Sequence, residues 1–405
     1  MKLLLVTPLS PNETGNGGAV RTRLLYESLC EVADVRVSVI DTWGARPHDA
    51  DVVPLESIRE VPPTEDPGQR FRGKMRLRRF LKTVWENHFR KPGDSERILA
   101  RLGWPGERFD AVVCRFAWIA YQTEAWKIAP LYIDIDDLPI EDFRSLQKPH
   151  FSRRRAFLFD WLIRLEQNFT FRRAVGTWIP NREHLEEVRR FSVCAHLPNT
   201  VRSVTPGYDE GLPRARRLAT VAALTYSANI HGIDWFLREV WPAFHAAEPD
   251  VEYVIAGRCP DPGVIRRWNA VEGVRAVGFV DDLDAFYAEC LGAVAPVFLG
   301  GGTAVKVIEA AMHGRRTFAT PFAARGLSDD EKRQLGIAEF SDAAAFVRSF
   351  REWTVVTDAA RTDSERKMHE FADANFSPQR FRAVVQQLLT CRRDAGACAA
   401  GGADE

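Results

Sequence analysis

The sequence predicts an α/β protein built from two doubly wound domains. Short apolar runs rich in β-branched residues alternate along the chain with longer helical patterns. This alternation begins again after residues 197–217, a segment rich in proline, glycine and arginine that is typical of an inter-domain linker. Because parallel strands need helical crossovers, the pattern indicates parallel sheets with helices on both faces.

The individual elements follow from these runs. In the first half we expect strands at residues 2–7, 35–40, 111–114, 131–135 and 175–179, and helices at 19–33 and 152–173. In the second half we expect strands at 218–224, 251–257, 274–280, 292–298 and 316–320, and helices at 230–247, 282–290 and 303–313.

These elements predict four regions. Residues 1–205 form an N-terminal Rossmann-like domain and residues 206–375 a C-terminal one. Residues 376–392 form a C-terminal helix that packs back on the N-terminal domain, and residues 393–405, rich in alanine and glycine, form a disordered tail. Ligands of such sheets bind at the carboxyl ends of the strands, so we expect the site in a cleft between the two domains.

The composition argues against several classes of protein. Of 405 residues, 45% are hydrophobic, which excludes a disordered chain, and Lys plus Arg equals Asp plus Glu at 55 each, which argues against a broad nucleic-acid surface. Seven cysteines without Cys-x-x-Cys spacing argue against a zinc ribbon, a redox pair or a disulfide framework. No run approaches the ~20 apolar residues of a membrane span, and the N-terminal apolar run is too short for a signal peptide. We therefore expect a cytoplasmic protein.

The stretch GGGTAVKVIEAAMHG, residues 300–314, is the leading candidate for a binding site. Glycines allow a backbone to approach a ligand closely, and the first turn of the following helix offers unpaired N–H groups to a phosphate. On that helix Lys306, Glu309 and His313 lie on one polar stripe. Lys306 suits a diphosphate and Glu309 suits ribose hydroxyls. The pattern alone leaves open an ordinary turn followed by a helical ion pair.

Residues 300–327 also resemble the donor-site pattern of retaining glycosyltransferases of family 4, which have the GT-B fold. That pattern is a glycine-rich loop, a helix carrying Glu, then Glu-Ala-x-x-x-Gly and a strand ending in Thr-Pro. Three further segments, TYSANIHGIDWFLREVWPAF, IAGRCP and VGFVDDLDAFYAEC, resemble family segments in the same order and at similar spacing. The N-terminal strand with its Gly-Gly loop, LYIDIDDL and LPNTV also resemble family landmarks.

The resemblance implies a donor site in the C-terminal half and an acceptor site in the N-terminal half, with transfer that retains the anomeric configuration. Glu309 matches the second glutamate of the family's Glu–seven residues–Glu motif, which contacts the nucleotide ribose. The first glutamate falls at position 301, which is Gly301 here. This departure puts the usual carboxylate contact to the sugar in doubt. Backbone N–H groups of Gly302 and Thr303 then become candidates to hold the sugar or the diphosphate.

A second departure concerns the leaving group. Members of the family carry a basic pair after the first C-terminal strand, and the corresponding segment ALTYSAN has none. Helix N-termini, Lys306 or Arg258 must then stabilise the charge of the leaving phosphate. We count Lys306, Glu309 and Arg258 as candidate catalytic residues. For Arg258 a plain surface position stays open. The resemblance implies a nucleotide-sugar co-substrate, by family frequency a UDP-sugar, and neither a metal nor another cofactor.

The rest of the expected donor site comes from two other loops and the helix that follows one of them. The resemblance places Phe279 and Val280 at the nucleotide base, with core packing as the alternative. Gly17 and Gly18 form the opposite wall of the site. Arg21, on the first turn of the helix that follows, suits a phosphate, with a solvated arginine as the alternative.

Two features of the N-terminal half point to other partners. The acidic run containing Asp134, Asp136 and Asp137 suits a metal, but its place at a strand end favours loop capping or acceptor contact. Residues 70–91 hold nine Lys or Arg with interleaved aromatic residues, and 144–164 repeat the theme. Such segments can lie on the inner face of an anionic membrane; the alternatives are a solvated face or acceptor-phosphate binding. We expect no nucleic-acid partner.

We therefore expect a retaining hexosyltransferase of polysaccharide biosynthesis type, which moves a sugar to a glycan, glycolipid or other acceptor. The departures at Gly301 and in ALTYSAN keep a non-catalytic sugar-nucleotide-binding protein as an alternative. A nucleotide-sugar epimerase is a second alternative, although the sequence shows no acid/base set for one.

Overall fold

The computed structural model describes residues 1–13, 17–40, 52–62, 93–144, 151–202, 204, 216–259, 261–299 and 305–390. The chain forms two compact units. The N-terminal unit comprises Met1–Pro198 and the chain from Phe381 onward, and the C-terminal unit comprises Asn199–Arg380. The sequence-based boundaries were placed at 205/206 and 375/376, whereas the chain passes between the units at 198/199 and 380/381.

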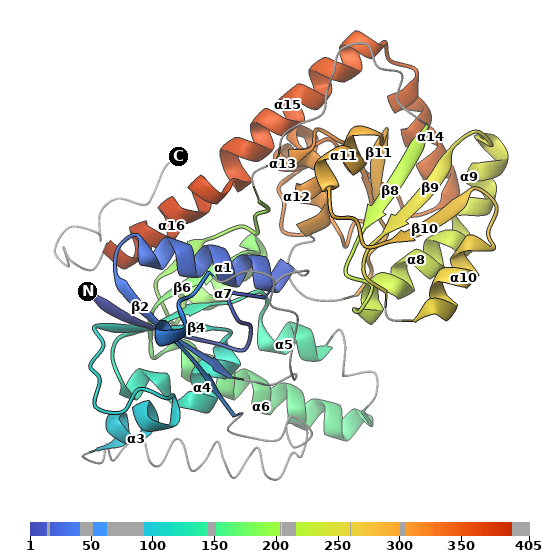
Figure 1. The fold of residues 1–405 in the computed structure, drawn as a ribbon. Coiled ribbons are helices and arrows are strands. Elements are labelled where there is room, and N and C mark those ends of the chain that lie inside the picture. Colours follow the sequence, from blue (N-terminus) through green and yellow to red (C-terminus); the bar gives the residue numbers. More distant parts are fainter. Residues whose placement is uncertain are drawn as a thin grey trace. The chain divides into compact units, whose positions relative to one another are not determined.

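A seven-stranded parallel sheet forms the centre of the N-terminal unit, in the order β3-β2-β1-β4-β5-β6-β7. Its strands are β1 (Lys2–Thr7), β2 (Asp34–Ile40), β3 (Ile58–Val61), β4 (Ala111–Arg115), β5 (Leu131–Asp134), β6 (Ala174–Ile179) and β7 (Cys194–His196). The strand order reverses direction between β1 and β4. Figure 1 shows helices on both sides of this sheet.

Helices cover both faces of this sheet. They are α1 (Gly17–Cys30), α3 (Asp94–Arg101), α4 (Ala117–Thr123), α5 (Pro139–Asp142), α6 (Arg153–Phe171), α7 (Leu185–Arg189) and α16 (Pro378–Thr390). Because side chains alternate along a strand, β1 supplies both cores. Leu4 and Val6 pack with α4 and α6 on one face, and Leu3 and Leu5 pack with α1 and α16 on the other.

The C-terminal unit contains a six-stranded parallel sheet in the order β10-β9-β8-β11-β12-β13. Its strands are β8 (Arg217–Val221), β9 (Glu252–Ala256), β10 (Val274–Gly278), β11 (Gly292–Ala295), β12 (Thr317–Ala319) and β13 (Ile337–Glu339). Its helices are α8 (Ser227–Glu239), α9 (Trp241–Ala247), α10 (Pro262–Asn269), α11 (Leu283–Ala288), α12 (Val305–Met312), α13 (Asp329–Gln334), α14 (Ala343–Thr354) and α15 (Asp358–Phe376).

The α/β class with two doubly wound sheets is confirmed, and every expected strand is present. One expected helix is wrong. Residues 230–247 form two helices, α8 and α9, that meet at Val240. Pro242 lies in the first turn of α9, where its missing N–H is harmless; inside a continuous helix its ring would clash with the carbonyl four residues earlier.

Candidate functional site

The reversal of strand order in the C-terminal sheet lies between β8 and β11. In open α/β sheets ligands bind at such a reversal, beyond the carboxyl ends of the strands. Helix α8 follows β8, and α12 is the next described helix after β11. The two helices therefore flank the expected binding position.

A hydrogen bond joins these two helices. Lys306 Nζ on α12 donates to Asn229 Oδ1 on α8 at 2.7 Å. The amide of Asn229 in turn donates through Nδ2 to the Ala223 carbonyl at 2.9 Å, which fixes its orientation. Asn229 therefore presents its oxygen to Lys306 and holds the ammonium group at the reversal.

The close approach of α8 depends on Gly232. A Cβ atom at this position would lie 1.7 Å from the carbonyl oxygen of Pro296, one residue beyond β11. No side chain fits there, so glycine lets α8 reach the end of β11 and brings Asn229 within reach of Lys306.

Glu309 lies one helical turn after Lys306 and accepts a hydrogen bond from the hydroxyl of Tyr287 on α11 at 3.4 Å. Burial raises the pKa of Glu309 to about 7, although Tyr287, Arg202 and Lys306 act in the opposite direction. Burial also lowers the pKa of Lys306 to about 8, against the attraction of Glu309. Both groups therefore titrate near neutral pH, which is frequent at functional sites.

His313, the third residue of the expected polar stripe, packs rather than titrates. Its ring stacks on Tyr287 with centroids 4.4 Å apart, and its Nδ1 lies 3.7 Å from Asp284 Oδ1. Burial first, and then Arg315, lower the pKa of His313 to about 3, so it is neutral at physiological pH. It supports the tyrosine that contacts Glu309.

The structure also brings together the predicted residues at the ends of β9 and β10. The N–H of Gly257 donates to the Gly278 carbonyl at 2.7 Å, which aligns the two strand ends. The guanidinium of Arg258 lies over the ring of Phe279, 5.0 Å from its centroid, and that ring is 52% exposed. Val280 is half-buried beside it. An exposed aromatic ring next to an arginine is a surface on which a planar base can stack.

The glycine-rich loop cannot be placed in the same way. Gly301, Gly302 and Thr303 lie outside the described residues, and α12 is described from Val305. Their contact with a diphosphate stays a prediction.

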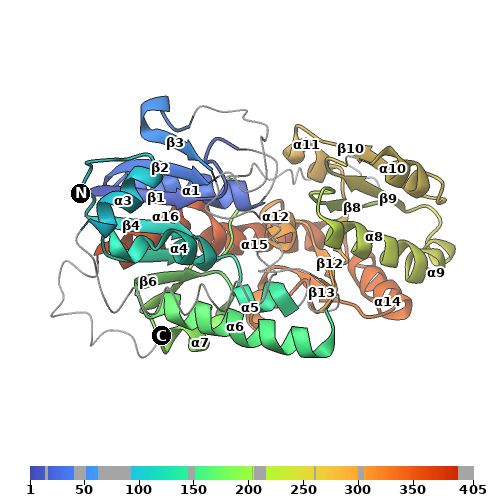
Figure 2. The ribbon, with the colours of Figure 1, turned by 90° about the horizontal axis from the view of Figure 1, so that it is seen from below.

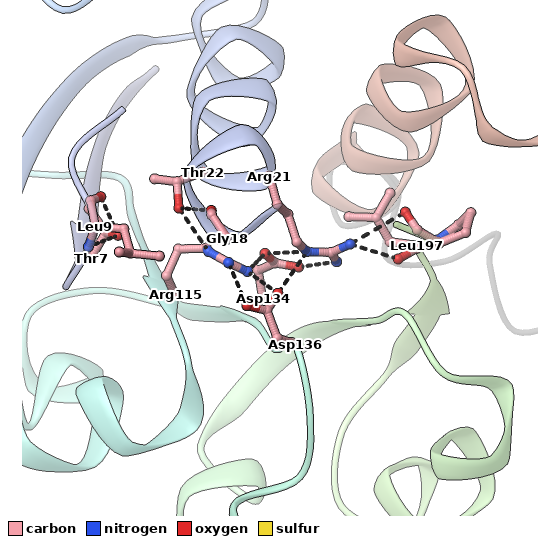
Figure 3. A network of polar contacts seen from close by, with 10 residues as sticks. Thr7, Leu9, Gly18, Arg21, Thr22, Arg115, Asp134, Asp136 and Leu197 are labelled. Atoms are coloured by element: carbon pink, nitrogen blue, oxygen red, sulfur yellow. Dashed lines mark hydrogen bonds and ion pairs between the residues drawn. The ribbon is translucent and has the colours of Figure 1, made fainter. Parts of the chain in front are cut away.

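In the N-terminal unit, α1 begins at Gly17, and Gly18 accepts a hydrogen bond from Thr22 Oγ1 at 2.9 Å. Figure 3 shows that Arg21 on α1 and Arg115 at the end of β4 both point toward Asp134 at the end of β5. Arg115 also binds both oxygens of Asp136 at 2.9 Å. These four side chains, Arg21, Arg115, Asp134 and Asp136, form what we call the arginine–aspartate network.

Only one member of the network is accessible. The side chains of Arg21, Arg115 and Asp134 are at most 3% exposed, whereas Asp136 is 30% exposed. Burial works against the charge of Arg115, but Asp136 and Asp134 more than offset this and raise the pKa of its guanidinium.

This arrangement changes two expectations. Asp134 neither caps a loop nor faces an acceptor, because its carboxylate is fully buried between two arginines. Arg21 is buried rather than solvated; it binds Asp134 and donates to the Leu197 carbonyl at 3.1 Å. Its contact with a donor phosphate stays a prediction.

No group of three or more His, Cys, Asp or Glu able to hold a metal occurs in the described part of the chain. Within the same part, no helix has the length and apolarity needed to cross a bilayer. The basic segment 70–91 lies outside the described residues, and of residues 144–164 the structure describes Arg144 and 151–164.

Residues 215–353 match the model of a family described as Glycosyl transferases group 1. Among solved structures, sucrose-phosphate synthase from Thermosynechococcus elongatus is similar, with a TM-score of 0.66, 15% identity and coverage of 98% of this chain and 100% of that one. HepE from Anabaena in complex with UDP has a TM-score of 0.60, 12% identity and coverage of 96% and 100%. A glycosyltransferase from Rickettsia africae ESF-5 has a TM-score of 0.58, 13% identity and coverage of 96% and 98%. No curated protein matches the sequence. At such identities the likeness to solved structures shows the fold.

Proposed function

We propose that this chain transfers a sugar from a nucleotide-sugar to an acceptor hydroxyl. The premise is that its residues 215–353 belong to the Glycosyl transferases group 1 family and that its fold is GT-B. The donor is a UDP-sugar, and the anomeric configuration is retained. HepE, which shares the fold, was solved in complex with UDP, and this supports the choice of base.

The observation that carries the proposal is the Lys306–Asn229 hydrogen bond beside Glu309 at the reversal of the C-terminal sheet. An ammonium group held at this position is a point charge suited to a phosphate. A carboxylate one turn further along the helix can accept hydrogen bonds from ribose hydroxyls. Phe279 offers its exposed ring to the base.

Departure of UDP builds negative charge on its β-phosphate. Lys306 stabilises this charge, because a protonated amine with a pKa of about 8 is mostly charged at neutral pH and becomes more so beside a dianion. The backbone N–H groups of Gly302 and Thr303 add to this stabilisation. The acceptor hydroxyl attacks on the face that the leaving group vacates and passes its proton to a phosphate oxygen.

The test is nucleotide binding followed by turnover. Calorimetry with UDP, GDP and a panel of UDP-sugars should show selective binding by the wild type. Binding should weaken roughly tenfold to a hundredfold in K306A and E309A if each loses a contact to a charged or hydroxyl group. The matched control is K367A, which removes an exposed helical lysine that pairs with Asp363.

Release of UDP from a UDP-sugar in the presence of acceptor separates a transferase from a non-catalytic binding protein. Interconversion of UDP-sugars without acceptor would indicate an epimerase. Undiminished UDP binding by K306A and E309A would refute the proposed donor site.

A further inference from the structure

Helix α6 carries an unusual concentration of exposed apolar side chains. Phe157 is 76% exposed, Trp161 48% and Leu158 39%. Their positions at i, i+1 and i+4 lie within one 100° sector of the helix. Among the described residues, no other helix exposes three large apolar side chains.

The opposite side of α6 is well packed, so this exposure is not a misplaced core. Phe159 and Ile163 are buried in the same apolar cluster as β4 and β5. Phe143 and Phe151 contact Phe159, with ring centroids 6.0 and 5.1 Å apart. The helix is thus fixed in rotation, and Figure 2 shows it along the outside of the N-terminal unit.

The first turn of α6 is strongly cationic. Arg153, Arg154 and Arg155 are consecutive and exposed, and none of them pairs with a carboxylate among the described residues. Cations at a helix N-terminus oppose the helix dipole, so these arginines do not stabilise the helix. The turn is suited instead to an external anion, which both the guanidinium groups and the dipole attract.

We propose that the surface made by Arg153, Arg154, Arg155, Phe157, Leu158 and Trp161, here called the α6 face, docks on an anionic lipid bilayer. The arginines bind lipid phosphates, and the three apolar side chains enter the interface between headgroups and acyl chains. Tryptophan favours this interface because its ring is amphipathic. Basic residues beside an exposed apolar face are the combination that anionic membranes bind.

The position of α6 links this surface to the expected acceptor side. Helix α5 follows β5, and it packs against α6 at Gln167, whose Oε1 accepts from the N–H of Ile140. Because β6 follows α6, the helix runs from the carboxyl edge of the sheet toward the amino edge. The α6 face therefore lies toward the edge that carries Asp136. If the proposed function holds, a lipid-linked acceptor is presented at that edge.

The test is co-sedimentation of the full chain with vesicles of phosphatidylcholine, with and without phosphatidylglycerol. The wild type should bind the anionic vesicles and lose binding in high salt. Both R153E/R154E/R155E and F157S/L158S/W161S should reduce binding by about tenfold or more. The matched controls are R238E/R266E/R348E and V355S, which change exposed residues of the C-terminal unit and should bind like the wild type.

Equal binding to neutral and anionic vesicles, or full binding by both α6 variants, would overturn the proposal. So would a wild-type dimer in gel filtration that F157S/L158S/W161S dissociates, because the occupant would then be a second copy of the chain. UDP binding, measured in parallel, should be unchanged in all variants. A failure of the donor site therefore appears separately from a failure of membrane docking.

Discussion

The sharpest prediction concerns Asp134 in the arginine–aspartate network. Asp134→Asn keeps the shape of the side chain but removes its charge. In the wild type, Asp134 accepts from Arg21 Nε at 3.0 Å and also from Arg21 Nη2 and Arg115 Nη1. The variant leaves two buried guanidinium groups with Asp136 as their only remaining carboxylate in the network.

The magnitude follows from burial. Removing one partner of a fully buried ion pair costs about 3–5 kcal/mol, since the remaining charge has lost both its partner and its water. Asp136 provides the matched control because it is 30% exposed and water can replace it. We expect Asp136→Asn to cost about 1 kcal/mol, as in an exposed pair.

Amide hydrogen exchange, followed by mass spectrometry, measures the loss of stability in both variants. Peptides from β4 and β5 report the N-terminal unit, while peptides from β8 and β9 serve as an internal reference. In Asp134→Asn the first set should lose protection and the second should not. A loss in Asp134→Asn below about 1 kcal/mol, or equal to that in Asp136→Asn, would refute the view that the network's strength comes from burial.

Three further predictions concern the C-terminal unit. Asn229→Asp places a carboxylate against Lys306. It should raise the pKa of Lys306 and weaken UDP binding about tenfold, as measured by calorimetry across pH. Unchanged affinity would mean that Asn229 does not position Lys306. Glu309→Gln removes a carboxyl whose pKa is raised to about 7 in the folded protein, so the wild type should lose stability relative to the variant as the pH rises from about 4.5 to 7. Urea unfolding at pH 5 and pH 8 checks this, and an equal difference at both pH values would contradict it. Gly232→Ala forces a Cβ into the Pro296 carbonyl, so α8 must move away. The variant should lower the free energy of unfolding by about 1–3 kcal/mol and weaken UDP binding. Unfolding curves and calorimetry measure the two effects, and unaltered values of both would show that α8 has room for the side chain.

The strands could be predicted because a strand buried on both faces reads as an uninterrupted apolar run, as in residues 2–7. The edge strands β3, β7 and β13 were missed. They have four, three and three residues, too few to show a period, and their pairing depends on neighbours distant in sequence.

The part of the candidate site that lies on a single helix could be predicted from the sequence. Lys306 and Glu309 share a helix, so their common face follows from helical spacing. Arg115 was missed although it is a charged residue at the end of an apolar strand, and this was the available signal. Its pairing with Asp134 arises from the register of β4 and β5, which places the two residues opposite each other. Asn229 lies 77 residues from Lys306, and nothing in the local pattern connects them.

The place of α16 has a consequence for how the protein is made. Its side chains Phe381, Val385 and Leu389 complete the apolar cluster over Leu3 and Leu5, so β1 cannot complete its packing until α16 has been synthesised. Residues 199–380, in contrast, form the C-terminal unit as one continuous stretch of chain. During synthesis on the ribosome, the chain of the C-terminal unit is therefore complete before that of the N-terminal unit, although its synthesis starts later. A fragment ending near residue 205 would keep α1 but lose α16, so this face of its sheet would be only partly covered and prone to aggregate.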